Sequence, residues 1–346
     1  MKKAIIWILI VLLLLGGGGA LYYLFSIGAI GFELPEATEP AKTDLIALYT
    51  EAALPTEPAP TEPAPTEPAP TEPAPTEPTE PQEAPRAISA DNYFVYDLRD
   101  DTFLEISGRQ TAKIYPASVT KLMTAYTALQ YMDPEEKIIV GDEISLIDWD
   151  SSRANIRVGD VLTLKQAIPA LLLPSGNDAA YSIAANVGRK ISGKNLEATA
   201  AINVFVNHMN KTARDLGMEN SHFENPDGMH LANHYVCPKD LVTLTEAILR
   251  TPLILDSAGT LKYTANTENR KMTWRNTNYL MSETSKYYVP YAIGMKTGYT
   301  SYAGNCLLSL FYAEDRLYLV GVFGAPTSAD RFADSKQLYE SIFEEN

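Results

Sequence analysis

A proline-rich, acidic stretch limits which part of this chain can build a packed core. Fourteen of the 23 prolines lie between residues 33 and 86, together with twelve acidic and two basic residues. From Pro55 a Thr-Glu-Pro-Ala-Pro repeat runs to about Pro75. Proline at this density favours an extended polyproline II chain, and the repeated glutamates keep it solvated. We therefore predict a spacer over residues 33–86, in which residues 55–86 reach on the order of 100 Å.

The residues before the spacer are apolar. Lys2 and Lys3 precede an apolar stretch from Ala4 to Phe32, which only Gly16 to Gly19 interrupt. This stretch is long enough to span a bilayer, and the lysines place its N-terminus inside. We predict a single-pass membrane anchor over residues 1–32, with the rest of the chain outside the cell membrane. A cleaved signal peptide, which would release a secreted protein, is the alternative.

The net charge of −15 originates mainly in the spacer. Residues 33–86 carry −10, residues 87–346 carry −7, and the N-terminus adds +2. The acidic balance therefore says little about a substrate, and no basic patch predicts a nucleic-acid partner. Cys237 and Cys306 lie far apart and form no metal-type or redox pair. Two buried free thiols and one disulfide both remain open at this point.

Residues 87–346 carry strand patterns at both ends and a mainly helical pattern between them. The N-terminal strands are expected at residues 92–98 and 103–106, the C-terminal strands at 292–297, 304–312 and 317–324. Helices are expected at residues 162–173, 178–189, 196–216, 238–250 and 329–344. The pattern predicts an α+β domain with one antiparallel sheet built from both ends, helices on its faces and an inserted, mostly helical lobe. A cleft would form between sheet and lobe.

Ser118 and Lys121 open an apolar, helix-like run in this domain. Residues three apart share one face of a helix, so the amine can reach the hydroxyl. Burial against a hydrophobic body shifts a lysine toward its neutral form. A neutral lysine can activate a serine as a nucleophile without a histidine. Taken alone, this pattern is also typical of an ordinary helix start.

Two further motifs lie where the predicted cleft has its walls. Ser175-Gly176-Asn177 precedes a helix of the lobe, and Lys296-Thr297-Gly298 lies on the first C-terminal strand. A glycine in a strand lets another backbone approach, as an extended peptide substrate along a sheet edge requires. The three motifs in this order, with Gly176 in place of an aspartate, resemble those of penicillin-binding proteins and class A β-lactamases.

The chain resembles the serine-type D-alanyl-D-alanine carboxypeptidases, the low-molecular-mass penicillin-binding proteins of peptidase family S11. The resemblance covers residues 88–346 and implies the β-lactamase/transpeptidase-like fold. Beyond the three motifs it extends through longer segments, at residues 116–124, 174–180, 223–228 and 294–300. The family commonly continues into a β-rich domain and a C-terminal membrane helix, whereas this sequence ends at Asn346. We therefore expect the N-terminal span to be the anchor.

The resemblance implies a role for each motif residue in cleaving a peptidoglycan stem peptide. Ser118 would attack the carbonyl between two D-alanines, and Lys121 would take its proton. Ser175 and Asn177 would relay a proton to the leaving amine and hold the substrate amide. The resulting acyl-enzyme would be hydrolysed by water, and β-lactams would be trapped at Ser118 as inhibitors.

The resemblance also implies how the substrate is held. Lys296 and Thr297 would bind the terminal carboxylate, and Arg331 resembles an arginine that shares this role. The oxyanion hole would use the backbone N–H groups of Ser118 and of Tyr299, which follows Gly298. Losing one such donor typically lowers turnover by about 10²–10³.

No cofactor and no metal are expected. His222, His230 and His234 match no zinc spacing such as His-Glu-x-x-His, so we interpret them as hydrogen-bonded loop residues. One alternative function is a serine β-lactamase, which needs a glutamate loop that we do not find between Asn177 and Lys296. Another is a catalytically inactive, tethered wall-binding protein, against which the intact motifs argue.

Overall fold

The computed structural model describes residues 87–313 and 315–344. The predicted anchor and spacer, residues 1–32 and 33–86, lie outside the described residues and stay predictions. Within the described ranges, no helix is both long and apolar enough to cross a membrane.

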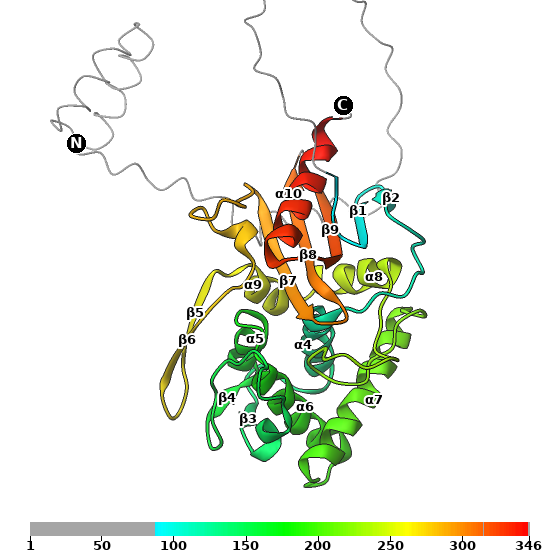
Figure 1. Ribbon diagram of the computed structural model, residues 1–346. Coiled ribbons are helices and arrows are strands. Elements are labelled where there is room, and N and C mark those ends of the chain that lie inside the picture. The colour runs from blue at the N-terminus through cyan, green and yellow to red at the C-terminus, as the bar shows by residue number, and fades with distance from the viewer. Residues whose placement is uncertain (1–86, 314, 345–346) are drawn as a thin grey trace, which may run out of the picture. The chain divides into compact units, whose positions relative to one another are not determined.

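A five-stranded antiparallel sheet forms from the two ends of the described chain, in the strand order β2-β1-β9-β8-β7 (Figure 1). Its strands are β1 (Asn92–Asp97), β2 (Thr102–Ile106), β7 (Ala292–Thr300), β8 (Gly304–Ala313) and β9 (Arg316–Ala325). β1 pairs with β9, which joins the N-terminal hairpin to the three C-terminal strands. The prediction of one sheet built from both ends is thereby confirmed. β7 is an edge strand, so one of its sides is not hydrogen-bonded to another strand of this sheet.

Helices cover both faces of the sheet, because successive side chains of a strand point to opposite faces. Leu307 and Phe311 of β8 pack with Phe332 of α10 (Ser328–Glu344), whereas Leu308 and Leu310 join the core that contains the other helices. These are α4 (Thr120–Tyr131), α8 (Pro238–Leu249) and α9 (Pro252–Gly259), together with the helices of the lobe. Both faces of β8 are therefore buried.

The inserted lobe consists of helices with two short strands at its edge. Its elements are β3 (Lys137–Ile139), η2 (Asp142–Leu146), β4 (Val161–Thr163), α5 (Leu164–Leu172), α6 (Asn177–Ser192) and α7 (Ala198–Leu216). Thr163 begins α5 through a capping box with Gln166. Gly193 and Gly217 end α6 and α7 in the left-handed conformation, which glycine adopts without steric cost.

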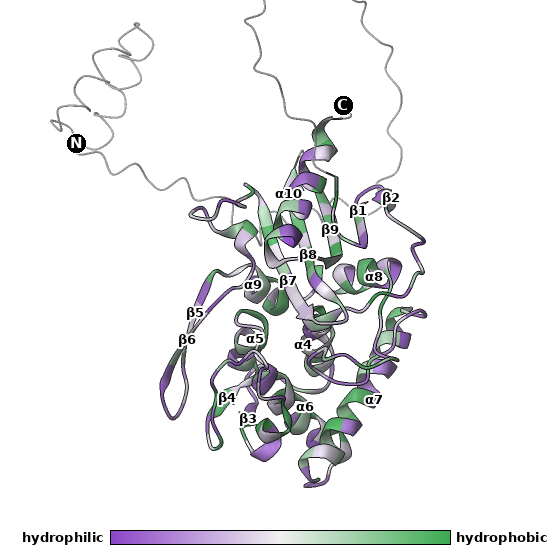
Figure 2. Ribbon diagram, in the orientation of Figure 1, coloured by the Kyte–Doolittle hydropathy of each residue, from purple (hydrophilic) through white to green (hydrophobic). Residues whose placement is uncertain are grey.

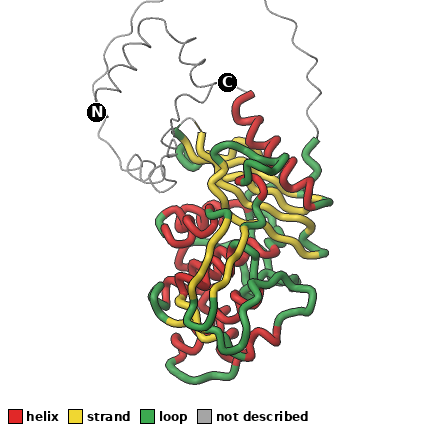
Figure 3. The backbone as a smooth tube through the Cα atoms, turned by 90° about the vertical axis from the view of Figure 1, so that its left-hand side faces the viewer, coloured by secondary structure: helices red, strands yellow, loops and turns green. Residues whose placement is uncertain are grey.

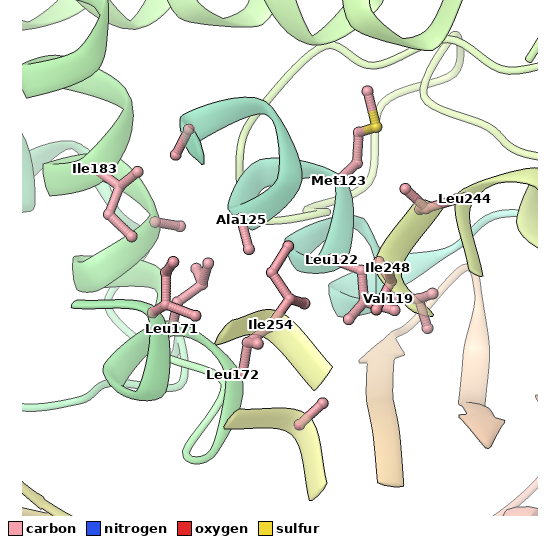
Figure 4. Packing of buried hydrophobic residues seen from close by; sticks show 14 of the residues in the cluster. Val119, Leu122, Met123, Ala125, Leu171, Leu172, Ile183, Leu244, Ile248 and Ile254 are labelled. Carbon is pink, nitrogen blue, oxygen red and sulfur yellow. The ribbon is translucent and has the colours of Figure 1, made fainter. Parts of the chain in front are cut away.

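Helix α4 lies at the centre of the core and joins the lobe to the sheet. Leu122 and Met123 on this helix are completely buried. Figure 4 shows them together with Leu171 and Leu172 of α5 and Ile254 of α9. A helix enclosed in this way has little freedom to move, so residues at its N-terminal end are held firmly.

The structure adds elements that the sequence did not predict, between residues 135 and 290. The β3–β4 pair was missed because each strand has only three residues. The second missed pair, β5 (Lys262–Asn266) and β6 (Lys271–Arg275), lies along the lobe in Figure 3, and its tip is hydrophilic in Figure 2. Trp274 fastens it by donating to the Ala154 carbonyl at 2.8 Å. Helix α9 was also not predicted.

Candidate active site

Ser118 lies in the short helix η1 (Ala117–Val119), which runs directly into α4. The preceding residue, Ala117, has a φ of 47° in the left-handed region, which is unfavourable for a residue with a side chain. Gly228 packs against this turn so closely that a Cβ there would lie 1.8 Å from the Ala117 carbonyl oxygen. Position 228 therefore has to be glycine for this loop to pack against the turn that holds Ser118.

Lys121 lies one helical turn after Ser118 and is completely buried. Its Nζ donates to Ser118 Oγ, Asn177 Oδ1 and the Asp227 carbonyl oxygen, each at 2.8 Å. Burial lowers the pKa of Lys121 to about 8, while the carboxylates of Asp227 and Asp178 act in the opposite direction. The structure thus brings the predicted serine and lysine together in a site that shifts the amine toward its neutral form.

The Ser175-Gly176-Asn177 motif lies at the entry to α6. Ser175 has a φ of 62°, and its carbonyl accepts from Ser152 Oγ at 2.6 Å. The Asn177 backbone amide donates to the Ser152 carbonyl at 2.8 Å. A neighbouring loop therefore fixes both motif residues, so that Asn177 Oδ1 reaches Lys121.

The Lys296-Thr297-Gly298 motif lies on the edge strand β7, next to the nucleophile. A Cβ on Gly298 would lie 2.9 Å from the Ser118 nitrogen and 3.0 Å from Ala117 Cβ, so only glycine allows this approach. Lys296 is buried and donates to the Thr297 carbonyl at 2.9 Å. Burial holds the pKa of Lys296 well below its usual value, and the positive charges of Lys121 and Arg331 lower it further.

Arg331 lies in the first turn of α10 and reaches the same strand. Its Nη1 donates to the Gly298 carbonyl at 2.9 Å, and its Nη2 donates to Ser328 Oγ at 3.0 Å. Among the described residues, neither Arg331 nor Lys296 forms a salt bridge. Two basic side chains without a carboxylate partner favour the binding of an anion, which would stabilise the charged form of each.

Most of these groups line a cleft of about 630 Å³. Seven of the nine predicted site residues line it: Ser118, Ser175, Asn177, Thr297, Gly298, Tyr299 and Arg331. The remaining two, Lys121 and Lys296, are buried beside it. Sequence reasoning missed the lining residues Asp148, Asp150, Ser151, Ser152, Pro174, Met229, His230, Thr277, Thr300, Ser301 and Tyr302. Pro174 and Thr300 lie inside the segments 174–180 and 294–300 that carry the resemblance, and Met229 and His230 follow the segment 223–228. The others lie on loops without a periodic pattern.

His234 and the two cysteines are buried in the packing of the domain, whereas His230 lines the cleft. His234 is buried, bonds to Thr120 Oγ1 at 2.8 Å, and has its pKa lowered to about 3 by burial. His230 stacks on Tyr302 with ring centroids 3.9 Å apart. Cys237 and Cys306 are buried free thiols, which settles the choice that the sequence left open. Across the described ranges, no three His, Cys, Asp or Glu side chains are grouped to hold a metal ion.

Known proteins resemble this chain in sequence and in structure. The sequence model of the D-alanyl-D-alanine carboxypeptidase family matches residues 77–327 of this chain. D-alanyl-D-alanine carboxypeptidase DacF of Bacillus subtilis is 30% identical over 236 residues, which are 67% of this chain and 56% of that protein. A D-alanyl-D-alanine carboxypeptidase of Streptomyces sp. strain K15 is 34% identical over 201 residues, which are 55% of this chain and 66% of that protein.

A solved structure shows the same fold. The Streptomyces K15 DD-transpeptidase is 28% identical, with a TM-score of 0.67, and the match covers 76% of this chain and all of that one. The predicted β-lactamase/transpeptidase-like fold is therefore confirmed. With a family match over most of its length and a shared fold, the chain belongs to the D-alanyl-D-alanine carboxypeptidase family of S11 peptidases.

Proposed function

We propose that this protein is a serine D-alanyl-D-alanine carboxypeptidase that removes the terminal D-alanine of peptidoglycan stem peptides. One observation carries the proposal: the buried Lys121 Nζ lies 2.8 Å from Ser118 Oγ at the cleft. A neutral amine has two hydrogens and one lone pair. In the ammonium form Nζ donates to all three partners. In the neutral form Asn177 Oδ1 and the Asp227 carbonyl can accept the two remaining hydrogens, which leaves the lone pair for the Ser118 hydroxyl.

Lys121 acts as the general base of acylation. With a pKa of about 8, roughly a tenth of the enzyme carries the neutral amine at pH 7. A lysine of ordinary pKa would provide on the order of 300-fold less. Lys121 takes the proton of Ser118 Oγ as this oxygen attacks the carbonyl between the two D-alanines. The ammonium that forms keeps its hydrogen bonds to Asn177 and Asp227.

The remaining cleft residues complete the reaction. The backbone N–H groups of Ser118 and Tyr299 stabilise the oxyanion, and each such donor typically contributes about 10²–10³ to turnover. Ser175 relays the proton that Lys121 took from Ser118 to the amine of the leaving D-alanine, so that Lys121 becomes neutral again. Water then hydrolyses the acyl-enzyme and restores Ser118.

The substrate's terminal carboxylate supplies the partner that Lys296 and Arg331 lack. Lys296 and Arg331 are basic side chains without a salt bridge in the described structure, and Thr297 provides a hydroxyl in the same cleft. A bound carboxylate raises the pKa of Lys296 toward its charged form, because an opposite charge favours ionisation. β-Lactams carry a carboxylate and a reactive amide, so they acylate Ser118 in the same way.

Transpeptidation is the second candidate, because the matched Streptomyces K15 structure is a DD-transpeptidase. It uses the same acyl-enzyme and differs only in transferring the acyl group to an amine instead of water. A β-lactamase activity has less support, because no glutamate is among the described residues that line the cleft.

The full chain incubated with a fluorescent penicillin tests the proposal. We expect covalent labelling that Ser118→Ala abolishes, and D-alanine release from a peptide ending in D-Ala-D-Ala. Equal labelling of the Ser118→Ala protein contradicts the mechanism. Adding an amine such as glycine measures the share of transfer, and rapid penicillin turnover without D-alanine release would point to a β-lactamase.

We also propose that the enzyme works outside the cell membrane, held by residues 1–32 at the end of the spacer 33–86. The apolar length, the two N-terminal lysines and the proline repeat support this placement. Membrane fractionation with alkaline extraction tests it. An anchored protein stays with the membranes, whereas a protein found in the medium that lacks these residues shows cleavage instead.

A further inference from the structure

We propose that Thr277 is a positioning residue for the substrate's carboxylate. Its hydroxyl lies 2.6 Å from that of Thr297 and orients Thr297 as a hydrogen-bond donor to the carboxylate. Both residues line the cleft. This inference rests on the proposed function, and it adds a residue that no sequence motif contains.

Thr277 connects the two walls of the cleft. It lies between β6 and the short helix η3 (Tyr279–Met281), close to the edge strand β7. Its backbone amide donates to the Leu173 carbonyl at 3.2 Å, at the end of α5 just before Pro174 and Ser175. The side chain of Thr277 thus bonds to the sheet while its backbone bonds to the lobe.

Two asparagines fasten the loop on either side. Asn276 Nδ2 donates to the Ala258 carbonyl at 2.9 Å and to the Thr260 carbonyl at 3.0 Å. Asn278 Nδ2 donates to the Gly294 carbonyl of β7 at 3.1 Å. A side chain between two such anchors loses little further entropy when it holds a partner in place.

The hydrogen count explains why the pair matters. A threonine hydroxyl has one hydrogen and two lone pairs. When Thr297 Oγ1 gives its hydrogen to a carboxylate, Thr277 Oγ1 has to be the donor within the pair. The result is a chain from Thr277 to Thr297 to the carboxylate, in which each bond polarises the next. Without Thr277, the hydroxyl of Thr297 is free to rotate and to point its hydrogen elsewhere.

Thr277 could instead only stabilise the loop, and the end group of the substrate distinguishes this structural role from an orienting role. The full chain is assayed with an acylated peptide ending in D-Ala-D-Ala and with the same peptide ending in the primary amide. The measurement is kcat/KM for each substrate, from release of D-alanine or D-alaninamide. An orienting role affects mainly the carboxylate substrate, because a charged acceptor gains most from an aligned donor.

We expect Thr277→Ala to reduce the carboxylate-to-amide ratio of kcat/KM about tenfold, mainly through KM. Thr277→Ser keeps the hydroxyl and should stay within about twofold of the wild type. The matched control is Thr273→Ala, which breaks a threonine pair, Thr264 and Thr273 at 2.9 Å, on the exposed surface of the β5–β6 hairpin. This control should leave the ratio unchanged.

Three outcomes would overturn the inference: an equal loss on both substrates, an unchanged ratio in Thr277→Ala, or a Thr277→Ser variant as impaired as the alanine variant. If the wild type labels with penicillin and releases D-alanine but the ratio does not respond, only the role of Thr277 is wrong. If the wild type does neither, the proposed function fails and this inference fails with it.

Discussion

The pH dependence of acylation follows from the surroundings of Lys121. Only the neutral amine can accept the serine proton, so the rate falls as pH drops below the pKa of about 8. The neutral fraction predicts a rise of about tenfold from pH 6 to pH 7, a smaller rise of about fivefold to pH 8, and a plateau above. The rate constant for labelling by fluorescent penicillin, measured from pH 5.5 to 9.5, gives this profile.

Asp227→Asn tests the cause of that pKa. The backbone carbonyl that binds Lys121 is unaffected, and the asparagine Oδ1 can still accept from the Met229 amide as the carboxylate does at 3.3 Å. The change removes a negative charge that favours the ammonium form of Lys121. We expect the midpoint to move to lower pH by about one unit, so that labelling at pH 6 rises several-fold.

Other charged groups around Lys121 stay in place in this experiment. Asp178 of α6 also favours the ammonium form, and Lys296 of β7 opposes it. Lys121 and Lys296 interact, so the measured midpoint belongs to the pair. His234 is neutral throughout this range, because burial lowers its pKa to about 3.

The control removes the same charge far from the site. Asp215→Asn on the exposed end of α7 breaks only a surface pair with Lys211 and should leave the midpoint unchanged. A midpoint that stays the same in Asp227→Asn, or moves to higher pH, would refute the reasoning that this carboxylate acts on Lys121.

Three further predictions concern the packing of the site and the domain. Gly298→Ala places a Cβ 2.9 Å from the Ser118 nitrogen, so penicillin labelling should slow about 10²-fold while circular dichroism shows a folded protein; labelling at the wild-type rate would contradict the close fit. Asp334 accepts from the amide and hydroxyl of Ser89 and from the amide of Ala90, so Asp334→Ala should lower the free energy of unfolding in urea by about 3 kcal/mol; a loss below about 0.5 kcal/mol would show that these bonds contribute little. Both cysteines are buried free thiols, so a reducing agent should not change Tm and a thiol reagent should react only after unfolding; a Tm that falls on reduction would reveal a disulfide.

The arrangement of the sheet was predictable because its strands have clear local patterns. β8 and β9 are strands of ten mainly apolar residues, and the N-terminal hairpin has a polar turn between two strands. Such patterns predict strands from the local sequence alone. The β5–β6 hairpin has weaker signals, and its position depends on contacts with the lobe, such as the bond from Trp274 to Ala154.

The sequence by itself determined the reacting groups of the site. Ser118 and Lys121 lie within one helical turn, so their contact follows from local geometry. Ser175-Gly176-Asn177 and Lys296-Thr297-Gly298 are short motifs whose letters can be read directly, and the resemblance assigned their roles.

Only the tertiary structure decided what tunes and supports those groups. Asp227 and Thr277 come from loops that are 106 and 159 residues away from Lys121 and Ser118, respectively. Their functions depend on a carbonyl 2.8 Å from Lys121 Nζ and a hydroxyl 2.6 Å from Thr297 Oγ1. Loop residues carry no periodic signal, and distances of this kind arise only when distant segments pack together. The physical reason is that burial and hydrogen bonding, which set the pKa of the base and the direction of a donor, are properties of the folded chain.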